Sequence, residues 1–281
     1  MEEKEKDSDK EIELAETSKE IEERKKKVVN YIKEKKDWIF YLILAFIISF
    51  SVYIRSLNIS KLKDITTGTW TLGPDLDPFL FLRWAEYIVK NGSLMVHDAM
   101  RNVPLGFYTS GEMKLLAYLI AWFHQILSAL SLSDSVTYSA ILFPVFFFAL
   151  TAIAFFLFVR KVFYKESKII KNIIALLATL FFVLVPSLLP RTIAGIPEKE
   201  SVAFFFMFMA FYFFLEAFIS EKFKKSLIFG ILAGVMTGLM ALVWGGMIFV
   251  FFSISTAVLI SFILGKVQFK EFIIYSAWLF S

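Results

Sequence analysis

Long apolar runs separated by short polar segments make up most of the chain from residue 38 onward. Several of these runs contain close to the ~20 apolar residues that an α-helix needs to cross a bilayer. The runs predict helices at about 38–57, 136–159, 173–189, 201–219, 227–243 and 247–264, and a last helix that begins near Glu271. The pattern therefore predicts an all-α polytopic membrane protein.

The long segment at about 59–135 does not follow this pattern and is mainly polar at its start. Within it, residues 78–92 read PFLFLRWAEYIVKNG, with Pro at a plausible first helical position and Gly at the exit. We expect a short amphipathic helix at the membrane interface. Residues 115–130 form an apolar run of only about 16 residues, which is short for a span and suits an interfacial or re-entrant helix.

The distribution of Lys and Arg decides whether residues 115–130 cross the membrane. If they do not cross, the basic loops 160–172, 220–226 and 265–270 all lie on the cytosolic side, as short basic loops usually do. If they do cross, all three loops lie outside. The first alternative is therefore preferred. It places the N-terminus in the cytosol and the segments 59–135 and 190–200 on the external face.

Composition narrows the possible chemistry. The chain is 58% hydrophobic, has 34 Phe and a mean hydropathy of +0.66, which is far from the composition of a soluble domain. It has no Cys and two His, which excludes disulfides and disfavours a zinc site built from several histidines. We expect membrane lipids, and no nucleic acid, among its partners. Residues 1–37 are rich in Glu and Lys and predict a solvated cytosolic tail, with an arm that binds a partner or anionic lipid as the alternative.

Two pairs of carboxylates fall in the predicted external segments. Asp75 and Asp77 lie in GPDLDPF, and Glu198 and Glu200 lie in PRTIAGIPEKE together with Arg191. Carboxylates next to a bilayer are costly unless they pair, bind an ion or line a polar site. Facing carboxylates suit Mg²⁺ or Mn²⁺ more than Zn²⁺, and Arg191 could orient a carboxylate or bind a phosphate oxygen. Simple hydration of each pair is the alternative, because such spacings are common.

Four motifs in a fixed order carry a resemblance to a known family. RTIAGIPEKE resembles the second acidic motif of the oligosaccharyltransferase catalytic subunit, and GPDLDPFLFLRWAEYIVKNG resembles its first acidic motif. PLGF at 104–107 and Trp-Gly-Gly at 244–246 also lie where that family has similar elements. The resemblance is to the N-terminal membrane portion of the family and covers roughly residues 38–281.

This resemblance implies a transmembrane domain of GT-C type. It also implies a metal-dependent enzyme that moves a preassembled oligosaccharide from a dolichyl (polyprenyl) phosphate or pyrophosphate carrier to Asn in N-x-S/T sequons. By motif position, Asp77 would bind the metal and contact the acceptor amide, Glu198 and Glu200 would complete a Mg²⁺ or Mn²⁺ site, and Arg191 would support catalysis electrostatically. The candidates for substrate binding are Asp75, which has no firm counterpart in the family, Arg101 and Trp244.

The chain departs from the family pattern in two ways. Glu198 stands where the family commonly has Asp, and the later external loop with a catalytic Glu, the sequon-reading motif and the soluble domain are absent. We therefore expect a C-terminally truncated chain that does not catalyse alone, with an archaeal rather than eukaryotic character. The alternatives are another GT-C enzyme, such as a protein O-mannosyltransferase, and a transporter, which would need charged residues within its spans.

Other conspicuous residues have structural explanations. His124 lies in an apolar segment and is expected to be packed rather than to bind a ligand. His97 and Asp98 are expected to form a hydrogen-bonded cluster near Arg101. The four-residue spacing of glycines predicts close helix packing at Gly230, Gly234 and Gly238.

Overall fold

The computed structural model describes Arg24 and residues 37–281, so the rest of the predicted cytosolic tail lies outside the described residues. The described residues belong to two units, whose boundary lies between Ala45 and Phe46. Helix α2 (Asp37–Ser56) crosses the boundary between them and provides the described residues of the first unit after Arg24. The arrangement described below concerns residues 46–281.

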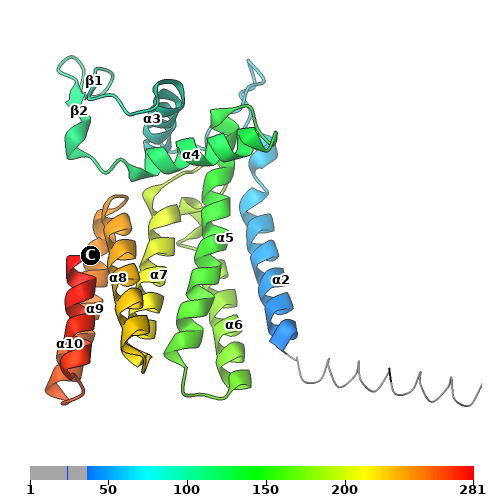
Figure 1. Ribbon diagram of the computed structural model, residues 1–281. Helices are drawn as coiled ribbons and strands as arrows, with labels where there is room; N and C mark the ends of the chain where they lie inside the picture. The colour runs from blue at the N-terminus through cyan, green and yellow to red at the C-terminus, as the bar shows by residue number, and fades with distance from the viewer. Residues whose placement is uncertain (1–23, 25–36) are drawn as a thin grey trace, which may run out of the picture. The chain divides into compact units, whose positions relative to one another are not determined.

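Helices form almost all of this unit, and Figure 1 shows their order along the chain. After α2 the elements are η1 (Ile59–Lys61), α3 (Asp77–Asn91), β1 (His97–Asp98), β2 (Phe107–Tyr108), η2 (Thr109–Gly111), α4 (Leu115–Ala129), α5 (Val136–Val162), α6 (Lys168–Leu184), η3 (Leu189–Arg191), α7 (Lys199–Ile219), α8 (Phe223–Ala241), η4 (Gly245–Met247), α9 (Ile248–Ile263) and α10 (Phe269–Phe280). Strands β1 and β2 pair antiparallel as a small hairpin in the segment between α3 and α4, which the sequence predicts to be external.

The predicted helix at 173–189 is wrong in its bounds. Helix α6 begins at Lys168 because the Ser167 side chain caps it, accepting a hydrogen bond from the Ile170 amide at 3.4 Å. It ends at Leu184 because Pro186 forces the preceding Val185 into an extended conformation. Part of the loop predicted at 160–172 is therefore helical. The rest of the apolar run after Leu184 is a turn region that leads toward the second acidic motif.

In the described part of the chain, five helices are long and apolar enough to cross a membrane. They are Trp38–Lys61, Val136–Val162, Lys199–Ile219, Phe223–Ala241 and Gly245–Ile263. Helix α6 has 17 residues and α10 has 12, so both are shorter than these spans. The prediction of a polytopic helical protein agrees with this set.

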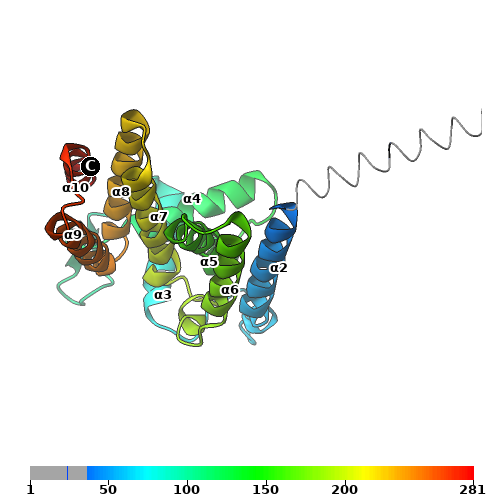
Figure 2. The ribbon, with the colours of Figure 1, turned by 90° about the horizontal axis from the view of Figure 1, so that it is seen from below.

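Helices α5 and α7 lie at the middle of the unit, with α6 on one side and α8, α9 and α10 on the other (Figure 2). Helices α3 and α4 lie across the upper ends of these helices rather than alongside them (Figure 1). The crosswise course of α4 agrees with the prediction that residues 115–130 do not span the membrane. Helices α3 and α4 therefore cover one end of the bundle (Figure 1).

Phenylalanine rings join the central helices. Phe182 of α6 stacks on Phe148 and Phe155 of α5, with ring centroids 5.5 and 4.5 Å apart. Phe208 of α7 meets the rings of Phe155 and Phe182 edge to face at 4.9 and 5.4 Å. Such aromatic pairs contribute roughly 0.5–1.5 kcal/mol each beyond the area they bury. These phenylalanines of α5, α6 and α7 thus serve helix packing.

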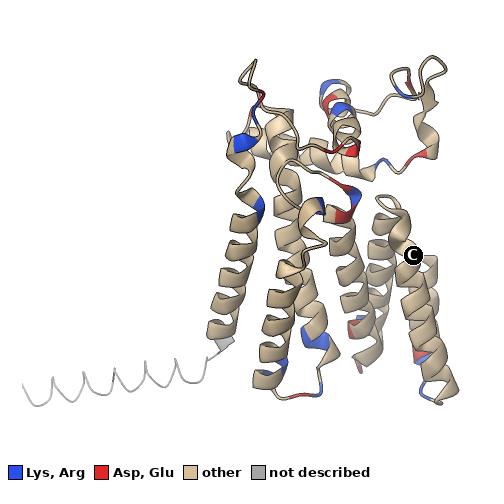
Figure 3. Cartoon of the chain, turned by 180° about the vertical axis from the view of Figure 1, so that it is seen from behind, with Lys and Arg blue, Asp and Glu red and all other residues tan. Residues whose placement is uncertain are grey.

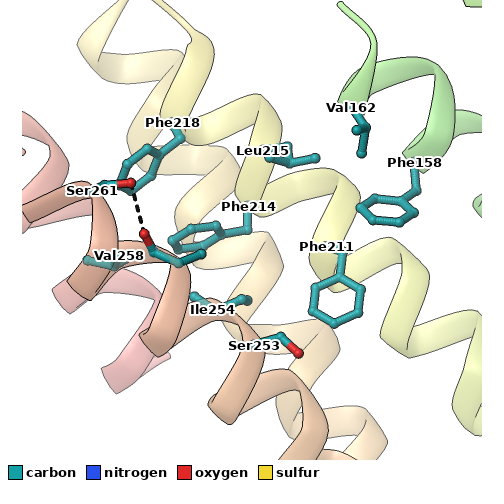
Figure 4. A pocket seen from close by; sticks show the side chains of 11 residues that line it. Phe158, Val162, Phe211, Phe214, Leu215, Phe218, Ser253, Ile254, Val258 and Ser261 are labelled. Carbon is teal, nitrogen blue, oxygen red and sulfur yellow. Dashed lines mark hydrogen bonds between the residues drawn. The ribbon is translucent and has the colours of Figure 1, made fainter. Parts of the chain in front are cut away.

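An apolar groove of about 420 Å³ lies between α5, α7 and α9. Figure 4 shows aromatic side chains such as Phe158, Phe211 and Phe214 turned toward it, with Ser253 and Ser261 from α9. The Ser261 hydroxyl donates to the Ala257 carbonyl within its own helix at 2.8 Å. The groove thus has no charged lining residue that could take part in polar chemistry.

Helices α8 and α10 approach closely at two of the three predicted glycines. A Cβ on Gly230 would lie 3.3 Å from the Ile274 carbonyl oxygen, and one on Gly234 would lie 2.5 Å from the Trp278 carbonyl oxygen. A Cβ on Gly238 would meet nothing within 4 Å. Close packing is therefore confirmed at Gly230 and Gly234, whereas Gly238 faces open space.

Gly234→Ala should separate α8 from α10, because its Cβ would overlap backbone that cannot turn away. We expect the free energy of unfolding in detergent to fall by about 1–3 kcal/mol, as overpacking of a tight contact usually costs. Gly238→Ala is the matched control and should leave stability unchanged or raise it by up to about 1 kcal/mol through helix propensity. Equal losses in the two variants, measured by thermal or denaturant unfolding, would contradict this packing.

Candidate functional site

The first acidic motif leads directly into α3. The Leu76 amide donates to Asp75 Oδ1 at 2.8 Å, which fixes the turn before the helix. Asp77 is the first residue of α3 and Pro78 follows it, where a missing N–H costs nothing. The Asp77 side chain is exposed and lies at the positive end of the helix dipole, which favours a carboxylate.

The second acidic motif leads directly into α7. Glu198 is the extended residue before this helix, and its main-chain carbonyl accepts a hydrogen bond from Ser201 Oγ at 2.6 Å. Glu198 is only 3% exposed, whereas Glu200 in the first turn is half-buried. Both motifs therefore place carboxylates at a helix N-terminus, and both helices begin near the same end of the bundle.

Main-chain hydrogen bonds hold the two motifs together. The Gly73 amide donates to the Gly195 carbonyl at 2.8 Å, and the Gly195 amide donates to the Ile141 carbonyl of α5 at 3.0 Å. Gly195 has φ = +82°, and a Cβ there would lie 3.1 Å from the Gly73 amide nitrogen and 2.5 Å from Leu62 Cδ1. Glycine is therefore required here both for the backbone conformation and for the close approach.

Arg55 is the residue that most strongly fixes the second motif. Its guanidinium is fully buried and donates to Thr192 Oγ1 and Ser51 Oγ at 2.9 Å each and to the Val183 carbonyl at 3.2 Å. It also lies over the Phe148 ring at 3.5 Å from the centroid. These contacts tie α2, α5, the end of α6 and the second motif into one structure.

Sequence reasoning did not single out Arg55. The signal was present, since an arginine in the last turn of an apolar helix is costly unless it has partners. Two further contacts act at the same place: the Ala194 amide donates to the Arg55 carbonyl at 2.8 Å, and Asn58 Nδ2 donates to the Ala194 carbonyl at 2.8 Å. The end of α2 thus positions the second acidic motif.

Arg191 links the two acidic motifs by charge. Its Nη1 lies 3.2 Å from Glu198 Oε1 and 3.7 Å from Asp75 Oδ2, and its side chain is half exposed. Figure 3 shows ribbon segments of acidic and basic residues near the N-terminal ends of α3 and α7. The two acidic pairs therefore share one face, as the predicted topology requires, and Arg191 contacts a carboxylate from each motif.

Burial is the main cause that raises the pKa of Glu198 to about 7. The negative charges of Glu200, Asp75 and Asp77 act in the same direction, and Arg191 opposes them. The positive charge of Arg191 is thus insufficient to return the pKa of Glu198 to its ordinary value. This end of the bundle has an excess of negative charge that a bound cation would relieve.

The residues present fit a divalent cation in their chemistry. The Oε1 atom of Glu198 is buried and makes no hydrogen bond, although it lies within ion-pair distance of Arg191. Carboxylate oxygens are the ligands that Mg²⁺ and Mn²⁺ prefer. Within residues 37–281, however, no group of three or more His, Cys, Asp or Glu side chains is already arranged to hold a metal. The predicted ligands are neighbours rather than a closed coordination shell.

Arg101 is tied into the external segment by an acidic partner. Its Nη1 lies 2.8 Å from Glu112 Oε2, and its guanidinium lies over the Phe107 ring at 4.0 Å. Burial would raise the pKa of Glu112, but the Arg101 hydrogen bond and the Lys199 charge lower it overall. Because Lys199 Nζ is 3.7 Å from Glu112 Oε1, Arg101 is linked indirectly to the residue beside Glu198. Its substrate role stays a prediction.

Trp244 packs within the loop that joins α8 to α9. Its ring lies edge to face with Phe204 of α7 at 5.8 Å, and a Cβ on Gly246 would overlap it at 2.1 Å. The neighbouring Leu242 carbonyl accepts a hydrogen bond from the Leu115 amide at 3.3 Å, which joins this loop to α4. These contacts explain Trp-Gly-Gly structurally, and a role of Trp244 in substrate binding stays a prediction.

Both histidines have structural partners. His124 is buried and its Nδ1 is 2.9 Å from Ser139 Oγ, which agrees with the predicted packed histidine. His97 Nε2 is 3.3 Å from the Leu105 carbonyl, and its ring occupies the space that a side chain at Gly106 would need. Neither histidine contacts the acidic motifs in these interactions.

Asp98 forms a hydrogen-bonded cluster, as predicted, and its side-chain partners are Arg83 and Trp84. Its two carboxylate oxygens accept from Arg83 Nη1 at 2.7 Å and Nη2 at 2.5 Å, and Oδ2 also accepts from Trp84 Nε1 at 2.9 Å. The side chain of Arg101, which follows closely in sequence, pairs with Glu112. The Arg83 hydrogen bond is the main cause that lowers the pKa of Asp98 to about 2.

Residues 39–281 match the protein family described as Oligosaccharyl transferase STT3, N-terminal. The chain belongs to this family. The match covers both acidic motifs, the external segment and the helices from α2 to α10. The resemblance inferred from the four motifs is therefore confirmed at the level of the family.

Curated relatives agree with this assignment. The chain is 28% identical over 182 residues to the dolichyl-phosphooligosaccharide-protein glycotransferase of Methanococcus voltae, covering 60% of this chain and 19% of the relative. It is 25% identical over 209 residues to the dolichyl-diphosphooligosaccharide–protein glycosyltransferase subunit STT3 of Saccharomyces cerevisiae, covering 73% of this chain and 28% of the relative. The chain thus spans between about a fifth and three tenths of the length of these relatives.

Solved structures share the fold. The apo oligosaccharyltransferase of Archaeoglobus fulgidus superposes with a TM-score of 0.63 at 23% identity, covering 78% of this chain and 25% of that chain. The same enzyme in complex with Zn and sulfate gives a TM-score of 0.62 at 24% identity over 74% of this chain and 26% of that chain. The predicted fold, an all-α membrane domain of GT-C type, is confirmed by these similarities together with the family match.

Gly195→Ala should loosen the junction between the two motifs. The positive φ costs a non-glycine residue roughly 1–2 kcal/mol, and the approach to Gly73 adds to it, so we expect a loss of more than about 2 kcal/mol in unfolding free energy. Gly68→Ala is the matched control, because Gly68 has φ = +69° but open space around its Cβ position. If both variants lose the same stability, the close approach contributes nothing and this account of Gly195 is wrong.

The Asp98 cluster should make the external segment sensitive to acid. Because the folded pKa of about 2 lies below the ordinary value of 3.8, the stabilisation, on the order of 2 kcal/mol, is complete above pH ~4 and lost as the pH falls toward ~2. Asp98→Asn removes it at every pH. Cleavage of residues 93–113 by an acid protease should therefore be slower in the wild type than in the variant near pH 4.5 and equal near pH 2. A rate ratio that does not change with pH would contradict this assignment.

Proposed function

We propose that the protein acts in protein N-glycosylation, in the transfer of a preassembled oligosaccharide from a dolichyl (polyprenyl) phosphate or pyrophosphate carrier to Asn in N-x-S/T sequons. Support comes from the family and from the printed names of the relatives. It also comes from a structure of the Archaeoglobus fulgidus enzyme tethered with an acceptor peptide containing the NVT sequon. The observation that carries the proposal is the junction of the two acidic motifs, where the Gly73–Gly195 hydrogen bond brings Asp75 and Glu198 to the same arginine.

The position of Arg191 suits a group that binds the phosphate of the lipid-linked oligosaccharide donor. Its side chain is half exposed, and its ion pairs with Asp75 and Glu198 are both made by the same nitrogen, Nη1, so neither pair uses the rest of the guanidinium. A guanidinium binds phosphate oxygens in a bidentate manner and keeps its charge at every relevant pH. We infer that Arg191 positions the phosphate leaving group of the donor and balances the charge that develops on it.

We infer that Asp77, Glu198 and Glu200 hold a Mg²⁺ or Mn²⁺ ion. Glu198 offers a buried oxygen without a hydrogen-bond donor, and burial, with the neighbouring carboxylates acting in the same direction, raises its pKa. When bound, the ion would act as a Lewis acid and as a template for the donor and acceptor. Glu200 lies in the first turn of α7 and Glu198 is the extended residue just before this helix, so both carboxylates lie at the same helix N-terminus and could serve the same ion.

Asp77 is the residue best placed to meet an acceptor. It is exposed at the start of α3, whereas Glu198 is buried, so an approaching Asn side chain can reach Asp77. A carboxylate oxygen there can accept a hydrogen bond from the side-chain amide N–H of the acceptor and orient its nitrogen. Asp75, Arg101 and Trp244 stay proposed contacts to the bound substrates.

The proposed orientation places the acidic motifs on the external face and the N-terminus in the cytosol. The short connections α5–α6, α7–α8 and α9–α10 lie at the end of the bundle opposite α3 and α4, and Figure 3 shows Lys and Arg there. Short loops rich in Lys and Arg stay preferentially on the cytosolic side. The position of these basic connections therefore supports a multi-pass membrane protein with its acidic motifs on the external face.

The decisive experiment is a transfer assay on the full-length protein in membranes, with a lipid-linked oligosaccharide and a sequon peptide. Asp77→Asn and Glu198→Gln should each reduce transfer by at least about 100-fold, because each removes a charge needed where charge develops. Asp64→Asn is the matched control, since Asp64 is an exposed carboxylate in the same external segment that caps its own turn. Undiminished transfer by either site variant would remove its proposed role.

Two further readouts separate the parts of this proposal. Mn²⁺ binding, followed by electron paramagnetic resonance in the absence of substrates, should weaken in Glu198→Gln but not in Asp64→Asn. Binding that is equal in the two variants would remove the metal site while leaving the transferase proposal intact. Labelling of Ser or Thr in place of Asn would favour a protein O-mannosyltransferase and contradict the proposed acceptor.

A further inference from the structure

A polar cavity lies at the end of the helices opposite the acidic motifs. It has a volume of about 240 Å³ and lies between the last turns of α5, the beginning of α6 and the last third of α7. Its lining combines cations, tyrosines and one carboxylate: Leu157, Arg160, Lys161, Tyr164, Lys171, Tyr212 and Glu216. Nothing in the proposed transfer reaction uses these residues.

The cavity carries a net positive charge. Lys161 Nζ lies 2.9 Å from Glu216 Oε1, and Lys225 Nζ lies 3.7 Å from Glu216 Oε2, so the carboxylate is already balanced by cations. Arg160 and Lys171 line the cavity as well. Three lining cations therefore face one lining carboxylate, and an anion in the cavity would meet more positive than negative charge.

Helix energetics explain the positions of Arg160 and Lys161 but not that of Lys171. Arg160 and Lys161 occupy the last turn of α5, where the helix dipole favours them. Lys171 lies near the beginning of α6, where the dipole disfavours a cation, and the first turn of α6 contains no acidic residue to offset it. The contribution of Lys171 to the cavity is thus better explained by a negatively charged ligand than by stabilisation of its own helix.

The surroundings indicate that the ligand comes from the membrane. On α6, Ile169, Ile170 and Ile173 flank Lys171 in sequence and are 58%, 46% and 44% exposed, as lipid-facing residues are. Tyr164 is exposed beside the cavity, and tyrosine is enriched where a bilayer meets water. A basic cavity between helices at the membrane surface suits the phosphate of a lipid headgroup, whose chains can lie along the exposed apolar side chains.

We propose that this cavity binds the phosphate of an anionic membrane phospholipid, with Arg160 and Lys171 as the principal contacts and the Tyr164 hydroxyl as an additional donor. The Lys161–Glu216 ion pair also lines the cavity. This site is independent of the acidic motifs, so its occupancy does not depend on the transfer reaction.

The test measures bound phospholipid by native mass spectrometry after reconstitution in nanodiscs of phosphatidylcholine with increasing phosphatidylglycerol. The wild-type chain should retain phosphatidylglycerol in preference to phosphatidylcholine. Arg160→Gln with Lys171→Gln should weaken this retention roughly 25-fold, since each surface cation contributes about five-fold. Lys222→Gln with Lys224→Gln is the matched control, because both lysines are exposed at the same end and neither lines the cavity.

Three outcomes would overturn the proposal. One is an equal loss in the site and control variants, which would indicate only diffuse surface charge. The second is retention that is unchanged in the site variant. The third is displacement of the lipid by inorganic phosphate at similar concentration, which would identify a free-anion site. Arg160→Lys with Lys171→Arg keeps the charge and should restore retention, and a thermal unfolding curve shows that each variant is folded.

Discussion

The arrangement of this protein's candidate site depends on how the short segment 192–198 is fixed between helices. Ala194 donates its amide to the end of α2, Gly195 donates to α5, and the Gly195 carbonyl accepts from Gly73 in the first external segment. Arg55 adds a buried guanidinium that bonds Thr192 at 2.9 Å. Every polar group in these contacts lies near apolar helices, where an unsatisfied one would cost several kcal/mol. The backbone of this segment is therefore held in place, and the backbone of Glu198 at its end is held with it.

This rigidity allows an unfavourable group to persist at the site. Glu198 is buried with a pKa raised from 4.5 to about 7, so its ionised form is destabilised relative to the unfolded chain. Below pH ~4.5 the carboxyl is neutral in both states and costs nothing; as the pH rises toward ~7 the penalty grows to on the order of 3 kcal/mol. Arg191 offsets part of this cost. A buried carboxylate that destabilises the folded state in this way is typical of a site that binds a cation or carries out a reaction.

Much of the fold could be predicted from the sequence because apolar length and basic loops are local properties. The bounds of α3 follow from Pro78 and Gly92, and the crosswise α4 follows from its short apolar run. The bounds of α6 could not be predicted in the same way, because the apolar run continues past Pro186 and hides the helix end. Hydrophobicity gives the extent of apolar sequence, whereas capping and proline geometry decide where a helix stops.

The candidate site was predictable in its residue types but not in its contacts. Asp77, Glu198 and Arg191 are visible as charges in loops between apolar helices, and topology alone places them on one face. Their juxtaposition, however, depends on pairs far apart in sequence, such as Arg55 and Thr192, which are separated by 137 residues. No local pattern encodes such a pair. What the sequence does encode is the cost of Arg55 in an apolar helix, and that cost implies a buried polar partner. A charged residue within an apolar helix therefore predicts a buried polar partner, and for Arg55 that partner lies in the second acidic motif.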